Sequence, residues 1–165
     1  MKKSKDSFLP YYNQFKDKIY NYFLYRVGFD KSLAEDLTSE VFIKALKSFI
    51  DFDESKKFQS WIYMIAHNHL VNHYKADNKI IPLEIVEDFL KYIDNSAEEK
   101  LELERVLKII DSMEDTDSEI IRFKFIDELS NQEIADLLNK EEGTVRTQIS
   151  RSLNKLREIL NNNSK

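Results

Sequence analysis

Five polar side chains between residues 144 and 151 have the chemistry to read DNA. They are Thr144, Arg146, Thr147, Gln148 and Arg151. Arg, Gln and Thr hydrogen-bond the base edges exposed in the major groove, while Lys155 and Arg157, further along, have the charge to hold phosphates. No Asp or Glu occurs from Gly143 to Arg157, although the whole chain has a formal net charge of -5. The stretch therefore predicts a DNA-reading helix.

A helix-turn-helix would position these side chains. Apolar residues recur at helical spacing within the stretch and would face inward: Val145, Ile149, Leu153 and Leu156. Upstream, Ser130 and Glu133 have the spacing of a capping box. The helix they begin would pack through Ile134, Ala135 and Leu138, and Asn139 can adopt the left-handed conformation that ends it. An alternative is that the late Arg and Lys residues only complement the helix dipole, but it does not explain the lack of acidic residues.

Two other groups of side chains are candidate metal ligands, but both are incomplete. His69 and His73 lie one helical turn apart, near His67, yet the glutamate of a zinc-protease helix is missing and no third ligand is evident. Carboxylates that could hold magnesium occur at Glu35, Asp36 and Glu40. Nothing nearby supplies a general base. We therefore expect no enzyme activity, no catalytic residue, no metal and no cofactor, and expect the histidines to line a nucleic-acid face.

The composition is typical of a helical protein. Eleven Phe and eight Tyr accompany only two Gly and two Pro among 165 residues, and apolar residues follow helical spacing, so we predict an all-α fold. Two glycines are too few for a glycine-rich phosphate loop. Cysteine is absent, no apolar run has the length of a membrane span, and we see no secretory signal before the first helix. We expect a cytoplasmic protein.

Helical periodicity predicts two small domains joined by a linker. In the first domain, residues 8–76, we expect helices over Tyr11–Val27, from a capping box at Ser32 and Glu35 to Phe49, and over Phe58–Lys75. Residues 77–97 are predicted to be the linker, with a possible short helix near Ile85–Ile93. The second domain, residues 98–162, contains the helix-turn-helix.

Two further helices are predicted ahead of the helix-turn-helix. Capping boxes at Ser96 and Glu99 and at Thr116 and Glu119 would begin them. From Ala76 to Glu119, fourteen acidic residues accompany five basic ones. We expect this stretch to lie away from the duplex or against a basic protein partner, or to form a solvated acidic face.

Two motif blocks resemble the small, two-domain extracytoplasmic-function (ECF) sigma factors of bacterial RNA polymerase. In the first half, AEDLTSEVF at residues 34–42 is similar to the family's polymerase-binding helix, and FQSWIYMIAHN at residues 58–68 is similar to its promoter-melting helix. In the second half, LSNQEIADLL followed by GTVRTQISR is similar to the domain that reads the upstream promoter element. The resemblance covers roughly Tyr11 to Leu160.

This resemblance implies a function and its partners. The chain would direct core RNA polymerase to promoter DNA, aid melting and so initiate transcription, and an anti-sigma factor would restrain it. Residues 8–76 would be a region 2-like domain and residues 98–162 a region 4-like domain.

The resemblance also implies three sets of site residues. Core polymerase would bind Glu35, Asp36 and Glu40. The minus-10 element would be captured and melted by Phe52, Lys56, Lys57, Trp61, Asn68, Tyr74 and Lys75. The minus-35 element would be read by Thr144, Arg146, Thr147, Gln148, Arg151 and Lys155. Tyr63 is a further aromatic candidate, and Trp61 has the alternative role of a core residue.

Two other functions fit the same helix-turn-helix. A stand-alone repressor or activator would use the first domain as a sensor or dimer interface and bind duplex DNA without polymerase. A decoy or anchoring protein would use both domains only to bind protein partners. The DNA-reading side chains of the second helix argue against the decoy.

Overall fold

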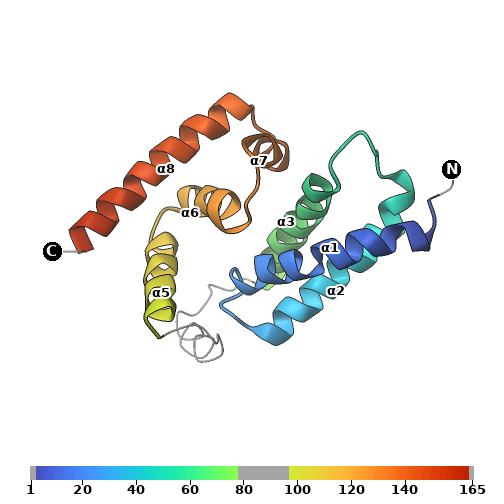
Figure 1. Cartoon of the computed structure of the whole chain (residues 1–165), viewed down its shortest axis with the longest axis horizontal. Helices are drawn as coiled ribbons and strands as arrows, with labels where there is room; N and C mark the ends of the chain where they lie inside the picture. Colours follow the sequence, from blue (N-terminus) through green and yellow to red (C-terminus); the bar gives the residue numbers. More distant parts are fainter. Residues whose placement is uncertain (1–2, 78–96, 164–165) are drawn as a thin grey trace. The chain divides into compact units, whose positions relative to one another are not determined.

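The computed structural model describes residues 3–77 and 97–163, which form helices joined by turns and loops (Figure 1). No strand occurs in these two segments, and the all-α prediction is confirmed. The chain divides into two compact units between residues 86 and 87. The predicted linker, apart from its two ends, lies outside the described residues, as do the possible helix near Ile85–Ile93 and the capping box at Ser96.

In residues 3–77, the described part of the N-terminal unit, the α-helices are α1 (Lys5–Leu24), α2 (Lys31–Ser48) and α3 (Phe58–Asp77). A short 3-10 helix, η1 (Phe49–Asp51), follows α2. Helix α1 begins earlier than the predicted Tyr11 and contains Pro10. Its start is stabilised by a capping box at Ser4 and by Phe8, whose ring packs edge-on against Phe49 at 5.1 Å between centroids. Capping and aromatic packing together outweigh the hydrogen bond that proline removes.

The turn between α1 and α2 places two residues in the left-handed region, Gly28 at φ 64° and Phe29 at φ 62°. Helix α2 is then capped by Asp30, whose carboxylate accepts a hydrogen bond from the Leu33 amide at 3.0 Å. The predicted capping box at Ser32 and Glu35 is wrong, because Asp30 already caps the helix and its charge complements the positive end of the dipole.

Aromatic rings form much of the core at one end of this unit. We call Phe8, Phe49, Phe52, Phe58 and Trp61 the aromatic cluster. The ring centroids of Phe52 and Trp61 lie 4.7 Å apart, and those of Phe52 and Phe58 lie 5.6 Å apart. This cluster joins α1, η1 and the start of α3, so it supports the loop that lies between η1 and α3.

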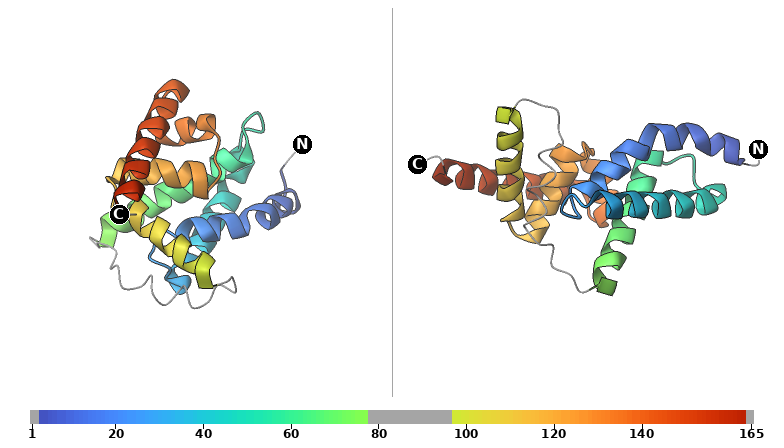
Figure 2. Two further views of the ribbon diagram at one scale, coloured as in Figure 1. Left: turned by 60° about the vertical axis from the view of Figure 1, so that its left-hand side comes forward. Right: turned by 90° about the horizontal axis from the view of Figure 1, so that it is seen from below.

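Helices α5 (Ala97–Asp111), α6 (Asp115–Ile121), α7 (Asn131–Leu138) and α8 (Glu142–Asn163) form the C-terminal unit. A π-helical turn, Arg122–Ile126, extends α6 (Figure 2). Helix α6 has Glu114 at its N-cap and no side-chain cap, so the predicted capping box at Thr116 is wrong. Because Thr116 is already inside the helix, its hydroxyl is not at the capping position.

The helix-turn-helix prediction is confirmed in detail. The Glu133 amide donates to Ser130 Oγ at 3.2 Å, and the Ser130 amide donates to Glu133 Oε2 at 2.8 Å. Asn139 ends α7 at φ 52° and ψ 49°, the left-handed conformation. Helix α8 is longer than the predicted stretch and includes one acidic residue on either side of it, Glu142 and Glu158.

Candidate nucleic-acid interface

Helix α8 turns opposite faces to the core and to solvent. Val145 and Ser152 have no exposed surface, and Leu156 is also buried. These residues lie on the stripe that packs against α6 and α7. The predicted base-reading residues lie on the other side: Thr144, Arg146, Thr147 and Arg151 are exposed and Gln148 is half-buried.

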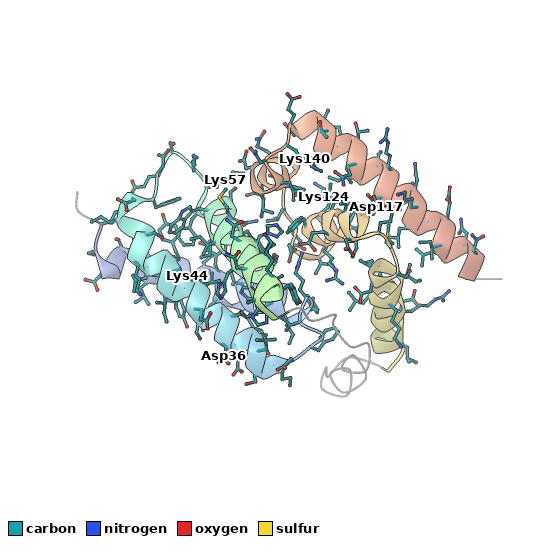
Figure 3. All side chains as sticks on the ribbon, turned by 180° about the vertical axis from the view of Figure 1, so that it is seen from behind. Asp36, Lys44, Lys57, Asp117, Lys124 and Lys140 are labelled. Atoms are coloured by element: carbon teal, nitrogen blue, oxygen red, sulfur yellow. The ribbon has the colours of Figure 1, made fainter. Side chains whose placement is uncertain are left out.

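Hydrogen bonds and an ion pair orient several of these side chains. Lys140 lies in the corner between α7 and α8 (Figure 3). Its ammonium donates to Gln148 Oε1 at 3.0 Å. Thr147 Oγ1 donates to the Gly143 carbonyl at 3.1 Å. Arg146 Nη2 lies 3.4 Å from Glu142 Oε1. Lys140 therefore helps to hold the Gln148 side chain in place, a contact that the local sequence pattern did not reveal.

A groove beside α8 brings most of the predicted minus-35 residues together. From α8 it is lined by Thr144, Thr147, Gln148, Arg151 and Lys155, and from the other side by Glu114, Thr116 and Asp117. Arg146 is not part of this lining. Glu141, directly before α8, also lines the groove, so polar and basic side chains of α8 share it with three carboxylates.

Asp117 is the buried residue on the side of the groove opposite α8. Its Oδ1 accepts a hydrogen bond from Ser152 Oγ at 2.5 Å, and its Oδ2 accepts one from Lys155 Nζ, also at 2.5 Å. The hydrogen bonds from Lys155 and Ser152 hold the pKa of the Asp117 carboxyl below its usual value. The hydrogen bond with Asp117 in turn raises the pKa of the Lys155 ammonium. Glu114 Oε2 lies 3.7 Å from this ammonium.

Two residues of the acidic stretch thus lie beside helix α8. Glu114 and Asp117 line the same groove as Arg151. Lys155 explains why this is tolerated, because its charge compensates both carboxylates, that of Asp117 through a hydrogen bond and that of Glu114 at 3.7 Å.

In the N-terminal unit, the predicted minus-10 residues divide into exposed and packed side chains. Lys56, Lys57, Asn68 and Lys75 are exposed. Phe52 is 4% exposed within the aromatic cluster. Its ring is therefore not presented as a platform for a base, and it anchors the loop instead.

The other aromatic candidates are also partly or fully packed. Trp61 is half-buried against Phe52 and Phe58, at 4.7 and 5.3 Å between ring centroids. Tyr74 is half-buried, and its hydroxyl donates to the Arg26 carbonyl. Tyr63 is 1% exposed, so the prediction that its ring could stack on a base is wrong. Among the aromatic candidates for the minus-10 element, Trp61 and Tyr74 retain surface on which a base could stack.

The acidic residues of α2 remain on its outer side. Glu35, Asp36 and Glu40 are exposed. Glu40 Oε2 lies 2.7 Å from His69 Nε2 on α3, and Lys44 Nζ donates to His69 Nδ1 at 2.7 Å. Burial, followed by the Lys44 charge, lowers the pKa of His69, which favours the neutral ring. Asp36 and Lys44 lie on the same helix in Figure 3.

Both halves of the chain match established protein families. The model for Sigma-70 region 2 matches residues 11–80, and the model for Sigma-70, region 4 matches residues 103–156. The ECF RNA polymerase sigma factor SigW of Bacillus subtilis is 33% identical over 178 residues, which cover 96% of this chain and 91% of SigW. The chain belongs to the ECF RNA polymerase sigma factors. This sigma factor serves promoter-specific initiation of transcription by RNA polymerase, as the motif resemblance implied.

A second ECF sigma factor, BldN of Streptomyces coelicolor, is 30% identical over 161 residues. The match covers 94% of this chain but 61% of BldN. Two solved structures share the fold. RpoE of Bartonella quintana, in complex with the anti-sigma factor NepR, has a TM-score of 0.74 and 19% identity, with 96% of this chain and 98% of that chain covered. CnrH, in complex with the cytosolic domain of CnrY, has a TM-score of 0.69 and 20% identity, with 96% of this chain and 90% of that chain covered.

The family assignment also decides between the alternative functions. Neither the stand-alone regulator nor the decoy predicts a Sigma-70 region 2 followed by a Sigma-70 region 4, and this sigma factor contains both. Among the described residues, no group of three His, Cys, Asp or Glu side chains is arranged to hold a metal. His67 Nδ1 instead lies 3.3 Å from the Tyr22 hydroxyl.

Within residues 3–77 and 97–163, no helix has the length and apolar character needed to cross a membrane.

Proposed function

We propose that the outward face of α8 reads the minus-35 element. The observation that carries this proposal is the groove in which Thr144, Gln148 and Arg151 lie together on an ordered helix-turn-helix. Arg146 and Thr147, exposed beside them, complete the base-reading set. Lys155 would contact a phosphate only in competition with Asp117 and Glu114.

The minus-10 element would bind the loop after η1 and the exposed side of α3. Asn68, Lys56, Lys57 and Lys75 are exposed there and have the polarity to hold bases and phosphates. Opening a duplex costs a few kcal/mol per unstacked base, and stacking on an aromatic ring can return about 1–3 kcal/mol. Trp61 and Tyr74 would provide stacking surface, while Phe52 would support the loop from the core.

The exposed carboxylates of α2 would bind the polymerase. Glu35, Asp36 and Glu40 form an acidic surface that suits a basic partner. In this assignment residues 8–76 form the region 2 domain, residues 98–162 form the region 4 domain, and residues 77–97 join them. The sigma factor would act in the cytoplasm without a catalytic centre or cofactor, lending sequence recognition to the polymerase.

An anti-sigma factor is a further partner that we propose. The solved RpoE structure contains the anti-sigma factor NepR, and this chain shares its fold. No residue of this chain is assigned to that contact.

The test is a run-off transcription assay with core polymerase and promoters altered in one element at a time. We expect Arg151→Ala to change the preference at the minus-35 element only, and Asn68→Ala to change it at the minus-10 element only. Lys16→Ala, an exposed change on α1, is the control. Unchanged preferences in both variants would contradict the assignment.

A further inference from the structure

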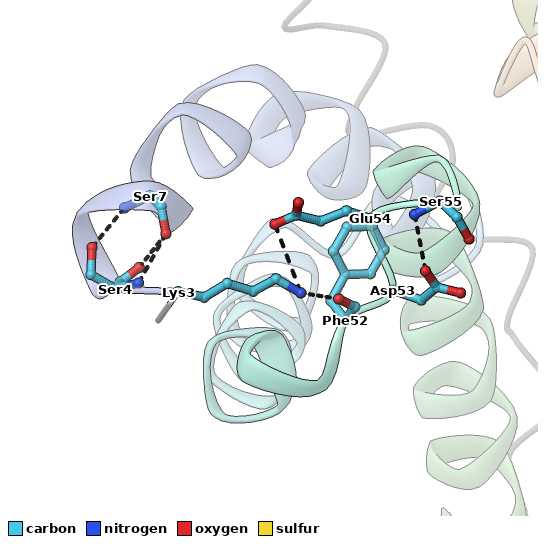
Figure 4. A network of polar contacts seen from close by, with 7 residues as sticks. All are labelled: Lys3, Ser4, Ser7, Phe52, Asp53, Glu54 and Ser55. Atoms are coloured by element: carbon cyan, nitrogen blue, oxygen red, sulfur yellow. Dashed lines mark hydrogen bonds and ion pairs between the residues drawn. The ribbon is translucent and has the colours of Figure 1, made fainter. Parts of the chain in front are cut away.

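Lys3, which precedes the first helix, contacts the loop between η1 and α3 (Figure 4). Its ammonium donates to the Phe52 carbonyl and lies 3.9 Å from Glu54 Oε1. The same nitrogen lies 5.7 Å from the ring centroid of Phe49 and 5.3 Å from that of Phe52. The Lys3 side chain is 17% exposed. One cation is thus held by a carbonyl, a carboxylate and two aromatic rings.

The start of α1 directs Lys3 toward this loop. Ser4 and Ser7 form a reciprocal capping box, in which the Ser7 amide donates to Ser4 Oγ at 3.3 Å and the Ser4 amide donates to Ser7 Oγ at 3.1 Å. One residue further on, Phe8 packs on Phe49 at 5.1 Å between centroids. The segment that carries Lys3 is therefore anchored to the same aromatic cluster that supports the loop.

The loop has its own hydrogen bonds. The Phe52 amide donates to the Phe49 carbonyl at 3.1 Å, and two further bonds lie beyond Phe52. The Ser55 amide donates to Asp53 Oδ1 and the Lys56 amide donates to the Asp53 carbonyl, both at 3.0 Å. These bonds close a turn, and the hydrogen bonds from Ser55 lower the pKa of the Asp53 carboxyl. The first residue of the loop is also held from outside the loop: its ring is buried in the cluster, and its carbonyl accepts from Lys3. Lys3 therefore adds a contact at the point where the loop leaves the core.

We propose that Lys3 is a positioning residue for recognition of the minus-10 element. It holds the loop so that Lys56 and Lys57 meet the DNA, and it does not itself touch DNA. This inference rests on the proposed function of the loop. A charge-assisted hydrogen bond and cation–π contacts in a partly buried position are strong enough to select one loop conformation. Lys3 precedes residue 11, where the match to Sigma-70 region 2 begins.

The test compares Lys3→Met and Lys3→Arg in holoenzyme reconstituted from the full chain and core polymerase. Methionine keeps an apolar stem on the rings but removes the charge, whereas arginine keeps the charge. Binding is measured by fluorescence anisotropy with two single-stranded oligonucleotides, one with the non-template minus-10 sequence of a promoter mapped by run-off transcription and one scrambled. We expect Lys3→Met to lose about tenfold in discrimination, the effect of one charge-assisted hydrogen bond.

Lys3→Arg should restore discrimination, because arginine keeps the charge beside the Phe52 carbonyl. Unchanged discrimination in Lys3→Met would overturn the proposal. Equal weakening on both oligonucleotides would also overturn it, because the loss of base contacts weakens binding to the minus-10 sequence more than binding to the scrambled one. Lys16→Met is the matched control on α1.

Lys57→Met and Asn68→Ala distinguish failure of this inference from failure of the proposed function. If these two variants discriminate as wild type does, the loop and α3 do not read the minus-10 element. If they lose discrimination while Lys3→Met does not, the loop functions without Lys3. Circular dichroism of each variant verifies that the helices remain folded.

Discussion

Lys155 Nζ donates to Asp117 Oδ2 at 2.5 Å and so joins two helices across 38 residues of sequence. Ser152 Oγ, one turn before Lys155 on α8, donates to the other carboxylate oxygen. The recognition helix is therefore anchored to α6 through a polar contact as well as through its apolar stripe. The same contact occupies a cation that would otherwise be available to a DNA phosphate.

Acid should weaken the fold through Asp117. Because its pKa is lowered in the folded state from the usual value of 3.8, the carboxylate stabilises the protein above that pH, and the stabilisation is lost as pH falls through the folded value. We expect the thermal unfolding midpoint of Asp117→Asn to fall less than that of wild type between about pH 5 and about pH 3. Asp115→Asn, an exposed change on the same helix, is the control. Parallel curves for wild type and Asp117→Asn would contradict this prediction.

Base reading should depend on Arg151. Its guanidinium lies in the groove on the outward face of α8, so Arg151→Ala should lose about 1–3 kcal/mol of discrimination at one base position of the minus-35 element. Anisotropy titrations with a set of single-base promoter variants would measure this loss. Arg157→Ala, further along the helix, should not alter base preference. Equal losses on every sequence would reassign Arg151 to a phosphate.

The charge on Asp117 should oppose DNA binding. Asparagine at this position keeps an acceptor for Ser152 but releases Lys155, so Asp117→Asn should bind minus-35 duplexes more tightly, with a salt slope steeper by about one. Titrations at several salt concentrations would measure both quantities, with Asp115→Asn as the matched control. Weaker binding with an unchanged slope would show that Lys155 only supports the fold.

Helix α7 should depend on its capping box. Ser130→Ala removes the oxygen that accepts from the Glu133 amide and should lower the free energy of unfolding by about 1 kcal/mol. Urea unfolding followed by circular dichroism would measure the change. Ser150→Ala, an exposed serine inside α8, is the control. No difference between the two variants would argue that water replaces the cap.

Polymerase binding should depend on the acidic face of α2. Asp36→Arg reverses an exposed charge and should abolish co-purification with core polymerase without altering the circular dichroism spectrum. Asp17→Arg, on the exposed side of α1, makes the same charge change elsewhere. Normal co-purification of Asp36→Arg would remove α2 from the proposed interface.

Local sequence signals predicted the helix-turn-helix correctly. The capping box at Ser130 and the left-handed Asn139 depend on neighbours within a few residues, so their pattern can be read directly. The same spacing was misleading at Ser32 and Thr116. There the helix had already begun at a preceding residue, and a serine or threonine followed by glutamate then lies inside the helix.

Long-range contacts could not be predicted in the same way. Asp117 and Lys155 meet only because α6 packs on α8, and Lys3 reaches Phe52 only because α1 packs on the aromatic cluster. The burial of Phe52 and Tyr63 has the same origin. Residue type showed that their rings could stack on bases, whereas packing determines that they face the core.

The most direct test is to mix the purified chain with core RNA polymerase and map transcription starts on genomic DNA. The account predicts a stable complex and starts at specific sites that share an upstream and a minus-10 element. Binding to duplex DNA without binding to core polymerase, and without specific starts, would contradict it.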